Sequence, residues 1–388
     1  MPFSYNRHGP FYRLQRRLGL LTDADLATGR RAALFVGVAW IPAVVLAAMQ
    51  GLAIDAHHER AILLDFSAYA LAIAIACFVL MEQTTDARMA HLVSQFEARG
   101  IVPAASRGGI AKARANMERR TDSWLAEAAI LVAAYGFAYL WLQRAPMTTE
   151  AGAWHGRMVD GSLQLTLAGW WVAIVFLPLY GFLLGRWLLR FVTWGFMLYD
   201  ISRCDLRLVA THPDRCGGLA FMGQYPKTYV LFVFAESTVV SAMVLKLVVH
   251  GDASLMSFKF ALFGMIACFA IAFVLPLAVF APRLVALKRQ GLAHYGSLAS
   301  RHNGAFETKW ISAPDAAPAE ELLGSPDPSS LADFAAGYDL IKRMLPVPVT
   351  LESVVPIVLA ALVPLVCVAV TQMPFALIIA EINKLLPF

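Results

Sequence analysis

The chain has 388 residues, of which 59% are hydrophobic and 15% are charged, and its formal net charge is +5. Soluble domains carry roughly 25% charged residues, so this composition excludes an ordinary soluble fold. Several apolar runs are about 20 residues long, which is the length of a helix that crosses a hydrocarbon core of about 30 Å. The composition therefore predicts an all-α fold, a polytopic transmembrane helical bundle.

Seven apolar segments are predicted to span the membrane within one helical domain of residues 1–388. In chain order they are 32–54, 61–81, 124–143, 165–184, 228–249, 258–281 and 354–372. The long connections 82–123, 185–227 and 282–350 are predicted to form helical extensions on the cytoplasmic side. The tail, residues 373–388, is expected to lie on the membrane surface as an amphipathic helix.

The basic residues are sorted between the two sides of the predicted membrane. Of the 32 Lys and Arg residues, 26 fall in the N-terminal arm and in the connections after spans two, four and six, whereas only four fall opposite them. Positively charged loops stay on the cytoplasmic side, so the N-terminus is predicted to be cytoplasmic. This sorting accounts for the net charge without a nucleic-acid partner, and membrane lipid is the expected partner.

Span five carries an ionisable side chain near its middle, Glu236. Burying such a group costs at least about 2.5–3.5 kcal/mol on insertion scales, so it usually has a purpose. Ser237 and Ser241 lie one turn apart beside it and extend a polar stripe. The stripe favours an ion path or a gate; a carboxylate held between helices only for packing is the alternative.

Span four and its extension combine small and basic residues. Gly181 and Gly185 form a small-xxx-small pair, which permits a close approach of another helix. Arg186 and Arg190 are four residues apart and share one face. In a homo-oligomer they would line a positively charged mouth on the cytoplasmic side, and the alternative is that they bind lipid phosphate.

A polar, glycine-rich turn, RLVATHPDRCGGLAFMG at residues 207–223, separates spans four and five. Its chemistry-bearing positions are His212, Asp214, Arg215, Cys216, Gly217 and Gly218. A structural joint is the favoured interpretation, because Asp can accept backbone N–H bonds and Gly permits positive φ. The alternative is a site that performs chemistry at headgroup depth.

Motifs for enzymes, metals and cofactors are missing from the sequence. There is no GxSxG, Walker-type glycine loop, HExxH, CxxCH or dinucleotide GxGxxG, and no CxxC or HxxxH pair for zinc. We therefore expect no resident metal and no cofactor, and a non-enzymatic function is favoured over an enzymatic one.

Two stretches resemble a family of bacterial polytopic inner-membrane proteins with a THPDRxGGL signature. They are GRWLLRFVTWGFMLYDISRCDLRLVATHPDRCGGLAFMG and ELLGSPDPSSLADFAAGYDLIKRMLPVPV. The resemblance implies a multi-pass protein of the bacterial inner membrane and carries over no catalytic or binding residue.

The leading functional hypothesis is a homo-oligomeric channel or transport protein for ions or small solutes, with Glu236 in its path. Two alternatives remain open. One is a membrane-embedded enzyme acting on lipid at the 207–223 turn, and the other is a non-catalytic membrane sensor or scaffold.

Overall fold

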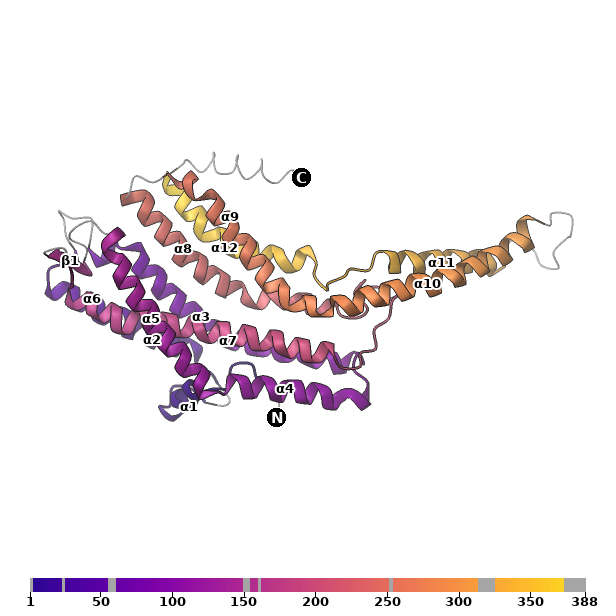
Figure 1. The fold of residues 1–388 in the computed structure, drawn as a ribbon, viewed down its shortest axis with the longest axis horizontal. Coiled ribbons are helices and arrows are strands. Elements are labelled where there is room, and N and C mark those ends of the chain that lie inside the picture. Colours follow the sequence, from indigo (N-terminus) through magenta and orange to yellow (C-terminus); the bar gives the residue numbers. More distant parts are fainter. Residues whose placement is uncertain are drawn as a thin grey trace.

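The computed structural model describes residues 3–22, 25–54, 61–148, 154–159, 162–250, 254–312 and 325–372. Within these ranges the chain is almost entirely helical (Figure 1). Seven helices are long and apolar enough to cross a membrane. The predicted all-α bundle with about seven spans is confirmed, whereas the predicted surface helix at 373–388 lies outside the described residues.

The helices follow the predicted spans, with shifted ends. In chain order they are α1 (Pro10–Arg17), α2 (Thr28–Met49), α3 (Phe66–Ala98), α4 (Arg107–Thr121), α5 (Trp124–Thr148), α6 (Leu167–Trp171), α7 (Leu177–Ser202), α8 (Val230–His250), α9 (Lys259–Val274), α10 (Ala281–Phe306), α11 (Asp327–Lys342) and α12 (Leu351–Gln372). A short π-helical segment joins α6 to α7, and a 3-10 segment joins α9 to α10. The two strands, β1 (Gly156–Val159) and β2 (Ser162–Leu165), form an antiparallel hairpin.

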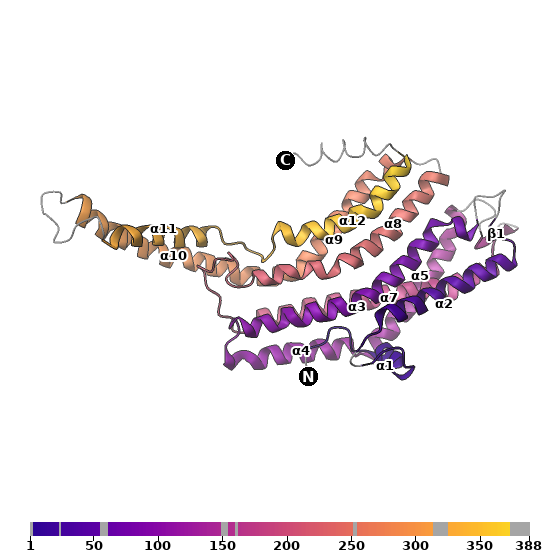
Figure 2. The same ribbon diagram turned by 180° about the vertical axis from the view of Figure 1, so that it is seen from behind.

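Helix α3 lies at the centre of the bundle. It packs against α2 on one side and α8 on another, while α5 packs against α7 and α12 packs against α8 (Figures 1 and 2). The N-terminal arm, which we define as residues 3–22, lies with α4 in the part of the bundle away from β1 and β2, beside the first turns of α2 and α5 and the middle of α3 and α7. We call this end of the bundle the arm end, and the opposite end, where β1 and β2 lie, the β end.

The contact between α5 and α7 depends on two glycines. A Cβ atom on Gly185 would lie 2.5 Å from Cγ2 of Ile130, and one on Gly181 would lie 3.2 Å from Cβ of Ala134. These separations are shorter than van der Waals contact, so any larger residue at Gly185 would push the two helices apart. The close helix approach predicted from this small-residue pair is confirmed.

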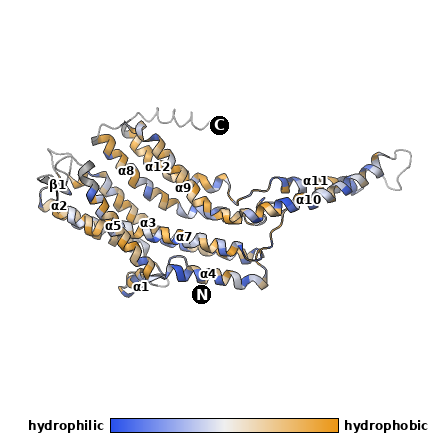
Figure 3. Cartoon of the chain, in the orientation of Figure 1, coloured by the Kyte–Doolittle hydropathy of each residue, from blue (hydrophilic) through white to orange (hydrophobic). Residues whose placement is uncertain are grey.

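Helices α10 and α11 pack against each other and project beyond the bundle at the arm end (Figure 1). Hydrophobic residues predominate on the bundle helices, whereas α4 and the projecting pair carry much of the hydrophilic colour (Figure 3). The predicted helical extensions are therefore present, and the polar parts of the chain gather at the arm end.

Candidate functional site

Glu236 lies near the middle of α8 and contacts α7. The Tyr180 hydroxyl of α7 lies 3.0 Å from each carboxylate oxygen of Glu236. Tyr180 is buried and Glu236 is half-buried. Over the described part of the chain, no Lys, Arg or His lies within ion-pair distance of this carboxylate. A neutral hydroxyl is therefore the polar group that holds Glu236.

The two serines next to Glu236 do not share its contact with α7. The Ser237 hydroxyl donates to the carbonyl oxygen of Ala361 in α12. Ser241, one turn further along, is buried, and its hydroxyl has no hydrogen-bond partner among the residues that the structure describes. The polar stripe seen in the sequence is thus divided, with Glu236 facing α7 and Ser237 facing α12.

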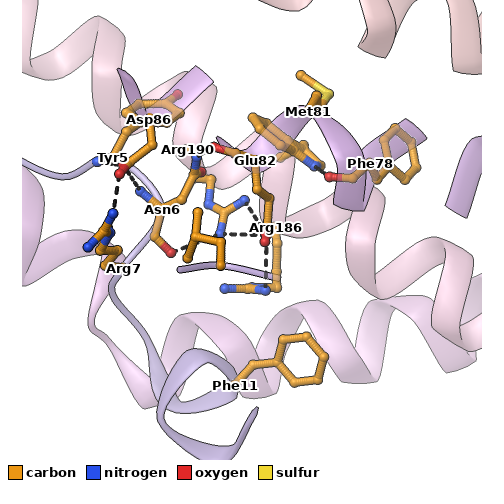
Figure 4. A network of polar contacts seen from close by, with 12 residues as sticks. Tyr5, Asn6, Arg7, Phe11, Phe78, Met81, Glu82, Asp86, Arg186 and Arg190 are labelled. Atoms are coloured by element: carbon orange, nitrogen blue, oxygen red, sulfur yellow. Dashed lines mark hydrogen bonds and ion pairs between the residues drawn. The ribbon is translucent and has the colours of Figure 1, made fainter. Parts of the chain in front are cut away.

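A second carboxylate, Glu82 of α3, is surrounded by arginines. Its carboxylate lies 2.7 Å from Nη1 of Arg31 in α2, 3.1 Å from Nη1 of Arg190 and 4.0 Å from Nη1 of Arg186. All four side chains are buried. Figure 4 shows Glu82 between Arg186 and Arg190, which approach it from α7. This carboxylate joins three helices at the arm end.

Arg186 also bridges to a third carboxylate, Glu127 in the first turn of α5. Its Nε atom lies 3.3 Å from Oε1 of Glu127, and its guanidinium lies 4.8 Å from the ring centre of Phe11. The other Glu127 oxygen accepts a hydrogen bond from the backbone N–H of Phe11 at 2.7 Å. Arg186 and Arg190 are therefore buried within the chain, and their predicted role at a cytoplasmic mouth stays a prediction.

The N-terminal arm completes this network. The Asp86 carboxylate accepts hydrogen bonds from the backbone N–H groups of Tyr5 and Asn6, at 2.6 and 3.0 Å, and lies 3.3 Å from Nε of Arg7. Arg190 donates to the carbonyl oxygen of Asn6. The arm is thus fixed to α3 and α7 by charged groups on both helices (Figure 4).

A buried tyrosine pair links the arm to α8. The hydroxyls of Tyr5 and Tyr229 are hydrogen-bonded to each other, and both residues are buried. Burial, together with the neighbouring Tyr229, raises the pKa of the Tyr5 phenol well above its ordinary value, so the phenol is neutral at pH 7. Tyr229 precedes Glu236 by two helical turns, which places both residues on one face.

The β end has its own ion pair. Lys246 of α8 lies 3.6 Å from the carboxylate of Asp65, which also accepts a hydrogen bond from Nε1 of Trp154 at 2.9 Å. The backbone N–H of Ser67 donates to Asp65, which caps the start of α3. Burial, reinforced by Lys246, lowers the pKa of nearby His155 to about 4, so this ring is neutral at pH 7.

In the 207–223 turn, Asp214 holds the backbone. Its carboxylate accepts hydrogen bonds from the N–H groups of Cys216, Gly218 and Ala220, at 2.8–3.1 Å, and lies 2.8 Å from Nδ1 of His212. Three of the four residues after Asp214 have positive φ: 57° for Arg215, 64° for Gly217 and 102° for Gly218. The structure therefore gives this turn the geometry of a joint.

The electrostatics of the turn agree with this geometry. Burial raises the pKa of the Asp214 carboxyl, but the three backbone N–H groups and His212 outweigh it, so the pKa lies below its ordinary value. Burial raises the pKa of the Cys216 thiol to about 11. The carboxylate is thus occupied with the backbone and the thiol stays protonated at pH 7, which leaves neither group ready for acid–base or nucleophilic chemistry.

The joint also fixes the turn to the rest of the protein. The N–H of Leu345 donates to the carbonyl oxygen of Arg215, and the N–H of Arg207 donates to that of Ile101. Cys216 is buried, and the position of a Cβ on Gly217 would be 3.1 Å from Leu287 of α10. The turn therefore connects α7, the start of α10 and the segment before α12.

Sequence reasoning found Glu236 and the turn, but it missed the residues that organise the arm end. Glu82 lies immediately after the predicted second span, within the predicted connection 82–123, and Asp86 follows it by one turn. Tyr5 and Asn6 lie in the N-terminal arm, for which the sequence indicates only a positive charge. The signal present in the sequence was a pair of acidic residues four apart, Glu82 and Asp86, which share one helix face.

Over the described part of the chain, no group of three or more His, Cys, Asp or Glu side chains is arranged to hold a metal ion. Comparison with known proteins found no matching family model, curated protein or solved structure. Fold and site together define a multi-pass membrane protein with a buried ionic network at one end and a weakly held carboxylate in the middle of one span. The functional argument rests on that geometry.

Proposed function

We propose that the chain is a membrane channel or transport protein that passes protons or small cations along α8, with Glu236 as the exchange site. The observation that carries this proposal is that, among the residues the structure describes, a neutral hydroxyl, that of Tyr180, holds the Glu236 carboxylate. An ionisable group inside a membrane protein marks ion and proton pathways. A carboxylate without a fixed counter-ion can release or take up a proton or a cation without breaking an ion pair.

Polar groups along α8 support a path on either side of Glu236. Tyr229 lies two turns, roughly 10 Å, towards the arm end, and Lys246 lies ten residues, roughly 15 Å, towards the β end. The Tyr229 hydroxyl is hydrogen-bonded to that of Tyr5, and Lys246 forms an ion pair with Asp65. Charged or hydroxyl-bearing groups thus occur near both ends and the middle of the same helix.

In this proposal the arm end is the closed side of the path. The arm is bound to Asp86 and Arg190, and Arg186 and Arg190 bind the buried carboxylates of Glu82 and Glu127 next to it. The two arginines thereby stabilise the closed state from inside the chain. A positively charged mouth would require both to leave these carboxylates.

The location and assembly are part of the same proposal. The arm end is cytoplasmic, because 26 of the 32 Lys and Arg residues belong to residues 1–31 and to the three connections 82–123, 185–227 and 282–350. The membrane is the inner membrane of a bacterium, as the resemblance to the THPDRxGGL proteins implies. The working unit is a homo-oligomer in a lipid membrane.

Flux through purified protein tests the proposal. The full chain is reconstituted in liposomes, a pH gradient or a K⁺ gradient is imposed, and an internal pH-sensitive dye reports proton movement. We expect flux through the wild type and a loss of at least about tenfold in Glu236→Gln, which keeps the shape of the side chain but removes its titration.

The matched control is Glu352→Gln, which changes an exposed carboxylate in the first turn of α12. It is expected to keep wild-type flux. Absence of flux in the wild type across a panel of cations and pH gradients contradicts the proposal, as does equal flux in Glu236→Gln and wild type.

A further inference from the structure

Helix α1 of the N-terminal arm lies between the first turns of two membrane helices. Its first backbone N–H groups include that of Phe11, which donates to Glu127 in α5. One turn further along α1, the Gln15 side-chain oxygen accepts a hydrogen bond from Nε of Arg31 in α2 at 2.7 Å. The phenyl rings of Phe11 and Phe35 of α2 are 6.0 Å apart. The position of α1 is therefore fixed at the arm ends of α2 and α5.

Neighbouring side chains mark the depth of this position in a membrane. Trp124 and Leu125 begin α5 and are 67% and 61% exposed, although both are apolar. Trp side chains on membrane proteins concentrate at headgroup level. Arg30, in the first turn of α2, is also exposed. Helix α1 thus lies beside residues that suit the boundary between hydrocarbon and headgroups.

The two faces of α1 differ in the way expected of a helix at such a boundary. Gln15 is buried against Arg31 of α2, and Tyr12 is buried against Leu21 and Leu26, which follow α1 in the chain. Leu14 and Leu18 are 51% and 64% exposed, and Arg17 between them is also exposed. The outward face therefore offers two apolar side chains for the acyl region and a cation for lipid phosphate.

We propose that the outward face of α1, formed by Leu14, Arg17 and Leu18 together with Arg30 of α2, is a docking surface for the anionic lipid leaflet at the arm end. Apolar side chains and cations on one surface match an anionic leaflet in both hydrophobicity and charge. The same arm binds Glu82, Asp86 and Glu127 through its other residues. Lipid bound to α1 therefore stabilises the position of the arm across the end of the bundle.

Amide hydrogen–deuterium exchange of the full chain tests this docking surface. The protein is placed in nanodiscs of phosphatidylcholine alone or with one third phosphatidylglycerol, and exchange is followed in peptides from residues 10–20. Each cation near an anionic surface contributes about fivefold to binding. We expect the anionic lipid to slow exchange in α1 by at least about fivefold, and Leu14→Glu with Arg17→Glu to abolish the difference.

A matched control pair is Leu298→Glu with Arg301→Glu on α10, because those residues are also exposed and three apart. This pair is expected to keep the lipid effect. The milder pair Leu14→Ala with Arg17→Gln, which leaves the buried face of α1 unchanged, is expected to reduce it. Equal exchange of wild-type α1 in the two lipids overturns the proposal, as does equal loss of the effect in the α10 control. No flux is measured, so the result is independent of the proposed transport activity.

Discussion

Glu82 and Glu236 are both acidic residues on long helices of the bundle, but their surroundings differ. Three arginines from two helices surround Glu82 at the arm end. One tyrosine hydroxyl holds Glu236 in the middle of α8. A buried carboxylate that has charged partners on several helices fixes those helices, whereas one with a neutral partner is able to change its charge. Glu82 therefore stabilises the packing of the helices at the arm end, whereas Glu236 in the middle of α8 is able to gain or lose a proton.

Glu82→Gln removes the charge that the three arginines surround, and it has the largest expected effect on the stability of the protein. Removing the charge leaves Arg31, Arg186 and Arg190 buried around a neutral side chain, and loss of one partner from a buried ion pair costs about 3–5 kcal/mol. We expect the unfolding transition of the protein in detergent to move to markedly lower temperature. Thermal unfolding of Glu82→Gln beside Glu352→Gln measures this effect, and a shift no larger than that of the exposed control contradicts it.

Asp214 is a third kind of carboxylate, because backbone N–H groups hold it instead of arginines. Asp214→Asn therefore tests how much such a carboxylate contributes to stability. Hydrogen bonds to a charged group contribute about 1.5–3 kcal/mol, and the amide weakens several of them at once. The pKa of Asp214 is lowered in the folded protein, so its contribution is present above the unfolded pKa of about 3.9 and is lost as pH falls through the folded pKa.

The measurement is thermal unfolding of wild type and Asp214→Asn at pH 7 and at the lowest pH at which both remain soluble. The wild type is expected to unfold at a higher temperature than Asp214→Asn at pH 7, and this difference in unfolding temperature is expected to become smaller at low pH. A gap that stays constant or widens as the pH falls shows that the charge of Asp214 is not what holds the turn.

Tyr180→Phe tests the surroundings of Glu236 and has the smallest expected effect on stability. It removes one hydroxyl from Glu236, and a typical hydrogen bond contributes about 0.5–1.5 kcal/mol. The expected consequence is a changed pH dependence of flux, because the carboxylate loses the group that stabilises its charged form. Flux profiles of Tyr180→Phe and wild type between pH 5 and 8 measure this, and superimposable profiles contradict a role for the hydroxyl.

The sequence predicts much of the fold because spans and small-residue contacts are local patterns. Apolar runs predict the seven membrane helices, and the glycines four residues apart predict the close contact between α5 and α7. Arg186 and Arg190 are also correctly placed on one face of α7, since both reach Glu82. Each of these features can be inferred from the spacing of residues within a single helix, without knowledge of the other helices.

The partners of these groups were beyond sequence reasoning because they lie far apart along the chain. Asp86 is 81 residues from Tyr5, and Arg190 is 184 residues from Asn6. No helical period relates such positions. The division between Glu236 and Ser237 was missed for a related reason: adjacent residues on a helix point about 100° apart, and only the packing of α7 and α12 decides which helix each one meets.

The N-terminal arm also imposes an order on biosynthesis. Tyr5 leaves the ribosome before its partner Tyr229, which follows 224 residues later. At roughly 5–20 residues per second, the arm waits on the order of ten seconds or longer before α8 exists. The arm is therefore made well before its partner in this hydrogen bond, and Tyr5 can complete the contact only after Tyr229 has been synthesised.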